Sequence, residues 1–138
     1  MNNKMIHKAG LFSCRDGAIL LCRRRKGSPL LILPGGKLER GETAQEALAR
    51  EIEEELGEVR VTELNRIGRY TGPAANDNGK TVVIDLFGGT LEGVPRPCAE
   101  IGELVWFGPD GDPAELAPSL RNSILPDLRR RGLLPPSA

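Results

Sequence analysis

Hydrophobic and polar residues in the first third of the chain form blocks about as long as β-strands. The stretch HKAGLFSCRDGAILLCRRR (7–25) predicts two short strands joined at Asp16-Gly17, because Asp-Gly is a common hairpin turn. After a break at KGSP (26–29), the run LLIL (30–33) predicts another compact strand. The next segment, PGGKLERGE (34–42), predicts a glycine-rich loop whose backbone can approach a ligand closely.

The middle of the chain predicts one helix and then further strands. Thr43 and Glu46 have the spacing of a capping box, which predicts a helix that begins there, and Gly57 is well placed to end it. The segments that predict strands after this helix are VRVTELNRIGRY (59–70), TVVIDLFGGTL (81–91) and EIGELVWF (100–107). The first two are separated by the polar segment 71–80, which predicts a loop.

The C-terminal segment SLRNSILPDLRRRGLL (119–134) spaces its apolar residues four apart from Leu120 to Leu128, as on one helix face. Pro126 interrupts this pattern and predicts a kink or a break. Several strands with one central and one terminal helix predict a mixed α/β sandwich. A length of 138 residues favours one domain, and we expect residues 134–138 to form a loose tail.

The predicted central helix is unusually rich in glutamate. On a helical wheel the residues facing the sheet are Ala44, Leu48, Ile52 and Leu56, and those facing water are Glu46, Arg50 and Glu53. Glu51, Glu54 and Glu55 share an arc that runs into the apolar edge. Carboxylates so placed can converge on a hard cation such as Mg²⁺ or Mn²⁺. The alternative is a solvated helix face, which is the commoner meaning of a charge run.

The stretch Gly36–Glu58, GKLERGETAQEALAREIEEELGE, resembles the Nudix box, Gx5Ex7REUxEExGU, in which U is a bulky aliphatic residue. Every charged and glycine position of the box is matched. The last aliphatic position departs from the pattern, because it holds Glu58, although Val59 follows immediately. The resemblance implies a Nudix-type α/β/α sandwich with a mixed β-sheet, a catalytic loop-helix at residues 36–57 and a C-terminal helix.

The resemblance also implies a metal site. Its ligands would be Glu51, Glu54 and Glu55, with the backbone carbonyl of Gly35 as a further candidate. Family members often add a carboxylate from outside the box, and the candidates are Glu100 and Glu103. An exposed strand position is an equally good interpretation of Glu103. Arg50 would pair with Glu42 and hold the loop in shape.

Nudix enzymes hydrolyse a nucleoside diphosphate linked to a group X, NDP-X, to NMP and P-X. Divalent ions, Mg²⁺ or Mn²⁺, would neutralise the diphosphate and acidify the attacking water. The residues expected to act in catalysis are Glu51, Glu54, Glu55, Arg50 and Glu103, with Glu54 as our choice of base and Glu103 as its rival. The candidates for substrate binding are Lys37, Gly35, Gly36 and Arg24. For the two charged side chains, Lys37 and Arg24, the alternative is a position that faces solvent.

The substrate stays open at this point. Pro73 lies 15 residues after Glu58, near where ADP-ribose pyrophosphatases of the family carry a proline, whereas the short chain suits MutT-like hydrolases of nucleoside triphosphates, including oxidised ones. The aromatic residues are expected in the core rather than stacked on a base: Phe12, Tyr70, Phe87, Trp106 and Phe107. His7 is expected to be a strand residue without a catalytic role. The alternative function is a non-catalytic nucleotide-binding or regulatory module of the same fold.

Charge and composition limit the classes of binding partner that we expect. The 19 basic and 19 acidic residues cancel, so no overall field favours nucleic acid or a membrane surface. No apolar run reaches the ~20 residues of a membrane span, and no secretory signal is evident. Three scattered cysteines suit reduced thiols, so we expect a cytoplasmic protein. Family members include homodimers, and the sequence leaves the oligomeric state open.

Overall fold

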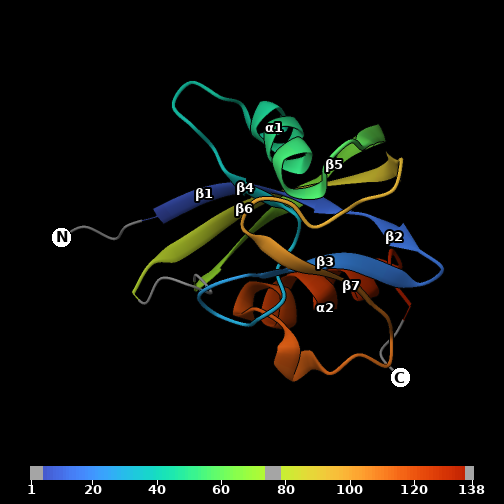
Figure 1. Ribbon diagram of the computed structural model, residues 1–138. Helices are drawn as coiled ribbons and strands as arrows, with labels where there is room; N and C mark the ends of the chain where they lie inside the picture. The colour runs from blue at the N-terminus through green and yellow to red at the C-terminus, as the bar shows by residue number, and fades with distance from the viewer. Residues whose placement is uncertain (1–4, 74–78, 136–138) are drawn as a thin grey trace.

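The computed structural model describes residues 5–73 and 79–135 (Figure 1). In chain order its elements are β1 (Met5–Phe12), β2 (Cys14–Arg15), β3 (Ala18–Arg24), β4 (Gly35–Lys37), α1 (Ala44–Leu56), β5 (Arg60–Pro73), β6 (Thr81–Glu92), β7 (Ile101–Phe107), the 3-10 helix η1 (Pro113–Glu115), the π-helix η2 (Leu120–Ile124) and α2 (Leu125–Arg130). Among these residues no helix combines the length and the apolar character needed to span a membrane.

The strands form two sheets. The larger has the order β4-β1-β6-β5 and the smaller the order β2-β3-β7. The larger sheet is mixed, because β1 runs parallel to β6 whereas β4 and β5 are antiparallel to their neighbours. Helix α1 lies above the sheets, and the C-terminal helices lie on the other side, as Figure 1 shows. This arrangement confirms the expected α/β/α sandwich with a mixed sheet.

Two apolar clusters hold the layers together. One joins the apolar face of α1, including Leu48 and Ile52, to the sheets. The other packs the C-terminal helices, including Leu120 and Leu128, on the opposite side. Removing these surfaces from water is the dominant favourable contribution to folding. The periodicity predicted both apolar faces correctly.

The first predicted hairpin is confirmed at its turn but not in its strands. Asp16 and Gly17 have positive φ values of 54° and 80°, as a two-residue hairpin turn requires, and β2 pairs with β3. The first strand, however, divides at Ser13. Residues 5–12 join the larger sheet and Cys14–Arg15 join the smaller one, so the chain passes between the sheets at this point.

Two further local predictions were wrong. Residues 30–33 form no strand, only isolated bridges, because Ile32 bonds to Cys22 whereas Leu31 bonds to the segment around Leu116. A continuous ladder needs one partner strand for successive residues. The start of the predicted glycine loop is instead a short strand, since Gly35–Lys37 pair with β1 as β4.

The predicted central helix and its capping box are confirmed: the Thr43 side chain accepts from the Glu46 backbone and the Glu46 side chain accepts from the Thr43 backbone.

The predicted loop 71–80 was partly wrong, because residues 71–73 extend β5, and residues 74–78 lie outside the described residues. The structure shows no break at Pro126, because residues 118–130 are helical throughout; the turn before Pro126 is π-helical instead of α-helical. Leu134, expected in the tail, is buried in the core, and residues 136–138 lie outside the described part.

Candidate active site

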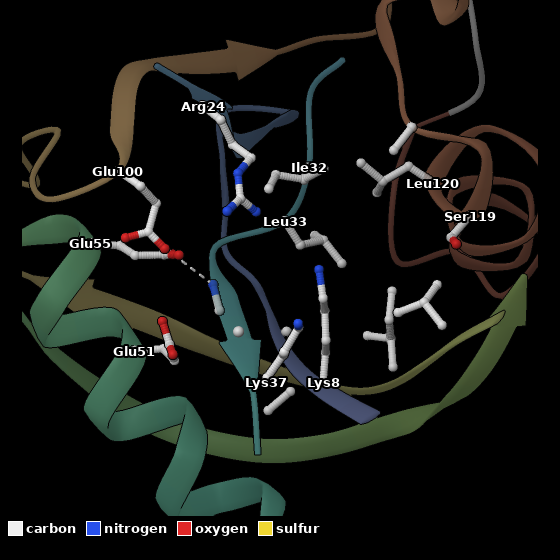
Figure 2. A pocket seen from close by; sticks show the side chains of 17 residues that line it. Lys8, Arg24, Ile32, Leu33, Lys37, Glu51, Glu55, Glu100, Ser119 and Leu120 are labelled. Carbon is white, nitrogen blue, oxygen red and sulfur yellow. Dashed lines mark hydrogen bonds between the residues drawn. The ribbon is translucent and has the colours of Figure 1, made fainter. Parts of the chain in front are cut away.

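A cavity of about 310 Å³ opens between the larger sheet, α1 and the start of the C-terminal helices. Figure 2 shows that its two ends differ in chemistry. The carboxylates lie at one end, Glu51, Glu55 and Glu100, and Leu120 lies at the opposite end. Ile84, which packs against the apolar cluster of Leu120, and Val82, which pairs with Gly72 next to Ser119, also line the cavity. Lys8, Arg24 and Lys37 line the cavity between them. A ligand that fits both ends therefore has a polyanionic part and an apolar part.

The acidic end is formed by three side chains from two distant segments. Glu51 and Glu55 are one turn apart on α1, and Glu100 comes from the residues just before β7. One carboxylate oxygen from each lies within 4.8 Å of the other two. Such a set of oxygen donors suits a hard divalent cation, which offsets the repulsion among three like charges. The donor set therefore fits the Mg²⁺ or Mn²⁺ that the sequence led us to expect.

The electrostatics of the cluster are consistent with a cation site. Burial raises the pKa of Glu55 to about 8; the Gly35 N–H lowers it, whereas Glu51 and Glu100 raise it further. Burial also raises the pKa of Glu51, and the hydrogen bond from Arg50 opposes this. Without a cation, these carboxyl groups hold their protons more tightly than exposed glutamates do. A bound divalent cation would favour the ionised forms.

Two glycines bring β4 close to this cluster. The Gly35 N–H donates to Glu55 Oε1 at 2.9 Å. A Cβ on Gly35 would lie 2.0 Å from the Ala9 carbonyl oxygen, and Gly35 has a φ of +136°, so only glycine suits this position. A Cβ on Gly36 would lie 2.4 Å from the carboxylate carbon of Glu51. Both glycines line the cavity, where their backbone is open to a ligand.

Arg50 ties the loop after β4 to the helix. Its guanidinium donates to both oxygens of Glu42 at 2.7 and 2.9 Å, and to the Lys37 carbonyl at 3.0 Å. It also donates to Glu51 at 3.0 Å. The hydrogen bonds from Arg50, followed by one from the Glu39 N–H, lower the pKa of Glu42 to about 2. The expected Arg50–Glu42 pair is confirmed, but the water-facing position from the helical wheel was wrong, because the loop folds back over Arg50.

The remaining carboxylate candidates lie elsewhere. Glu54 is about half exposed, with 53% of its side chain accessible, and accepts a 3.4 Å hydrogen bond from Arg50. Of the two candidates outside the box, the structure brings Glu100 rather than Glu103 into the cluster. Glu103 accepts from Arg23 at 2.8 Å on the exposed part of β7. Neither Glu54 nor Glu103 lines the cavity.

The structure places both of the charged residues that were predicted to bind substrate at the cavity. Arg24 and Lys37 both line the cavity, and Figure 2 shows the Arg24 guanidinium on the side of Glu55 and Glu100. Sequence reasoning missed Lys8, which reaches the cavity because it pairs in register with Lys37 across β1 and β4. Nothing in the sequence showed this register. The prediction that the aromatic residues lie in the core is correct for Phe12, Phe87 and Phe107, but it was wrong for Trp106, which is 39% exposed on β7. No aromatic side chain is among the described residues that line the cavity.

Comparison with known proteins decides the family. The family model described as the NUDIX domain matches residues 8–127. The chain belongs to the Nudix family. Two relatives support this Nudix assignment over most of the chain. A putative 8-oxo-dGTP diphosphatase 2 from Mycobacterium tuberculosis is 35% identical over 130 residues, which cover 83% of this chain and 90% of that protein. A putative 8-oxo-dGTP diphosphatase from Bacillus subtilis is 34% identical over 107 residues, covering 76% and 68%.

Other Nudix relatives differ in their named substrate. An ADP-ribose pyrophosphatase from Methanocaldococcus jannaschii is 38% identical over 86 residues, covering 56% of this chain and 49% of that protein. The chain therefore spans about half the length of this relative. Among solved structures, a MutT Nudix hydrolase from Burkholderia pseudomallei superposes with a TM-score of 0.74 at 30% identity, covering 86% of this chain and 94% of that one.

Proposed function

We propose that this Nudix hydrolase cleaves the diphosphate linkage of a nucleotide, NDP-X, to NMP and P-X with the help of Mg²⁺ or Mn²⁺. The convergence of Glu51, Glu55 and Glu100 at one end of a cavity with an apolar opposite end carries this proposal. Phosphates would lie against the acidic end through the metal, and the nucleoside would occupy the apolar end. The phosphoanhydride bond nearest the nucleoside, which is the bond that breaks, would then lie beside the metal site.

The metal would be held by Glu51, Glu55 and Glu100, with Glu54 and the Gly35 carbonyl as further ligands. When bound, it neutralises phosphate charge and lowers the pKa of a coordinated water. Lys8, Arg24 and Lys37 add positive charge along the cavity, which favours the charge that develops on the phosphates during transfer. The backbone of Gly35 and Gly36 allows the phosphates a close approach.

We assign the proton-accepting role to Glu54. It lies on α1 between Glu51 and Glu55 in sequence, its side chain is about half exposed to water, and Arg50 holds one oxygen. The exposed part of the carboxylate is open to an attacking water. Glu103 is a weaker candidate, because it lies on β7 instead of α1 and its bond to Arg23, at 2.8 Å, is shorter than the 3.4 Å bond between Arg50 and Glu54.

Within this reaction, nucleoside triphosphates, including oxidised purine nucleotides, are the better supported substrates. The two relatives that match along most of both chains carry the name putative 8-oxo-dGTP diphosphatase. ADP-ribose is a second candidate, because one relative is named for it. A non-catalytic binding module is less well supported, because every carboxylate of the Nudix box is present.

A substrate panel tests the proposal. The purified protein is incubated with 8-oxo-dGTP, dGTP, dATP, ADP-ribose, a dinucleoside polyphosphate and a nucleotide sugar, each with Mg²⁺ or Mn²⁺. Chromatography of the products distinguishes NMP plus pyrophosphate from NMP plus ribose 5-phosphate. We expect metal-dependent NMP release, fastest with a nucleoside triphosphate. Binding of nucleotides without any product would refute the hydrolase and support the binding module.

A further inference from the structure

Among the described residues at the apolar end of the cavity, one has a polar side chain, Ser119. Ser119 is 5% exposed and immediately precedes η2. It lines the cavity beside Leu120, across from the acidic cluster, as Figure 2 shows. Its neighbours in the lining at this end are aliphatic, including Val82 and Ile84. A hydroxyl group in such surroundings needs a hydrogen-bond partner to offset the loss of water.

The Ser119 hydroxyl has no such partner among residues 5–73 and 79–135. Residues 118 and 119 are already helical, so Ser119 lies within the first turn of the C-terminal helical segment and not in front of it. Its dihedrals are helical, with φ −61° and ψ −41°, and its side chain makes no capping bond of the kind that serine makes in front of a helix. A helix cap therefore does not explain this serine. Ser119 is thus a nearly buried residue whose hydroxyl is unpaired within the described chain and lines the cavity.

The opposite strand leaves room for the hydroxyl. Gly72 pairs with Val82 at the end of β5, and a Cβ on Gly72 would lie 3.1 Å from Ser119 Oγ. That distance is closer than ordinary van der Waals contact, so a side chain at residue 72 would push the hydroxyl aside. The glycine keeps Ser119 Oγ in its present position at the apolar end.

We propose that Ser119 is a specificity residue whose hydroxyl hydrogen-bonds a polar group on the edge of the nucleobase. The inference rests on the proposed function, because it takes the occupant of the cavity to be a nucleotide. With the phosphates at the acidic end, the base enters the apolar end with its faces against aliphatic side chains. A hydroxyl both donates and accepts, so it pairs with either an exocyclic oxygen or an amino group. A base without a polar group at that point leaves the hydroxyl unpaired and binds less well.

Guanine nucleotides that differ by one edge group test this assignment. We would measure kcat/KM for 8-oxo-dGTP, dGTP, dITP (which lacks the 2-amino group) and the 2-aminopurine nucleotide (which lacks the 6-oxygen). Ser119→Ala should lower kcat/KM about tenfold for nucleotides that carry the recognised group, as expected for one lost hydrogen bond. The nucleotide without that group should be unaffected. An equal loss for all four nucleotides, or no loss for any, would overturn the proposal.

Two further variants separate recognition from structure. Ser123→Ala makes the same change one turn later, outside the cavity lining, and should leave every kcat/KM unchanged. Gly72→Ala should shift selectivity in the same direction as Ser119→Ala, because it displaces the hydroxyl. The Tm of the ligand-free Ser119→Ala protein should not fall, since no hydrogen bond within the described chain is lost. A clear fall in Tm would indicate a structural role and contradict the proposal.

Binding measurements keep this test independent of turnover. If the wild-type protein hydrolyses none of the four nucleotides, the proposed hydrolase function fails for this class. Dissociation constants for α,β-imido analogues of the same nucleotides then test Ser119 alone. The same base-dependent loss of affinity in Ser119→Ala would support the recognition role, and uniform affinities would refute it.

Discussion

The carboxylate of Glu51 occupies the space that a side chain on Gly36 would need. A Cβ built on Gly36 would lie 2.4 Å from the carboxylate carbon and 2.6 Å from the nearer oxygen of Glu51. The glycine of β4 thus sets the position of a carboxylate on α1. The spacing of residues 36 and 51 in the sequence reflects this contact between two elements.

Gly36→Ala should weaken metal binding without unfolding the protein. The new methyl group must displace Glu51 from the cluster with Glu55 and Glu100, and displaced positioning groups typically cost about tenfold or more in metal affinity. Calorimetric titration with Mn²⁺ measures the change. Gly108→Ala is the matched control, because a Cβ there meets nothing within 4 Å. Equal affinities for both variants would show that Glu51 does not bind the metal in this position.

Glu100 and Glu103 provide a paired test of the third ligand. Glu100→Gln should weaken Mn²⁺ binding about tenfold, because the amide has lost the charge that attracts the cation. Glu103→Gln should leave Mn²⁺ binding unchanged, since Glu103 pairs with Arg23 on the exposed side of β7. The reverse pattern in the same calorimetric assay would assign the outer ligand to Glu103.

Glu54→Gln should lower kcat by about 10²- to 10⁴-fold, the usual contribution of a positioned base. Because the Glu54 side chain is about half exposed, we expect little change in Tm. Steady-state kinetics on the best substrate measure the loss. Glu53→Gln changes the adjacent exposed residue and should retain wild-type rates. A Glu54→Gln protein with undiminished kcat would remove Glu54 from the mechanism.

Arg50→Lys should reduce kcat/KM about 100-fold, a magnitude typical of an ångström-scale misplacement of catalytic groups. A lysine cannot reproduce the two bonds to Glu42 together with those to Glu51 and the Lys37 carbonyl. The loop that follows β4 should then exchange its amide hydrogens faster, which mass spectrometry detects. Arg40→Lys serves as the control for a charge-conserving change in the same loop. Unaltered exchange with lost activity would point to a direct chemical role for Arg50.

Asp85→Asn tests a second polar network, whose residues do not line the cavity. Asp85 is 3% exposed in its side chain and accepts from Arg69 at 2.8 Å, Arg66 at 3.0 Å and His7 at 2.6 Å. Burial opposes ionisation of Asp85, but the hydrogen bonds from Arg69, His7 and Arg66 outweigh it and hold its pKa well below the ordinary value. His7 is a strand residue in this network and does not line the cavity, in keeping with the structural role expected for it.

The lowered pKa of Asp85 determines how the free energy of unfolding changes with pH. A carboxylate with a lowered folded-state pKa stabilises the protein above the ordinary aspartate pKa of about 4, and this stabilisation is lost as the pH falls toward the folded-state pKa. Asp85→Asn should therefore lower the free energy of unfolding by about 2 kcal/mol at pH 7, below the usual cost of breaking a fully buried pair because the arginines are half exposed. The difference should shrink below about pH 4 in urea titrations. Asp110→Asn, at an exposed position, is the control, and a pH-independent difference would contradict the charge argument.

The sequence determined the parts of the site that depend on local order. Helical periodicity placed Glu51 and Glu55 on one side of α1 beside its apolar face, and the capping box located the start of the helix, because both are set by residues three or four apart. The Nudix box added the pairing of Arg50 with Glu42. These relations hold within a single loop and helix, so they were available without the rest of the chain.

Only the tertiary structure decided what distant segments contribute. It brought Glu100 rather than Glu103 to the acidic cluster, paired Lys8 with Lys37, and left the Ser119 hydroxyl unpaired in an apolar wall. It also divided the first strand between two sheets at Ser13. The physical reason is that strand register and sheet membership follow from packing across the whole molecule, which no short window of sequence contains.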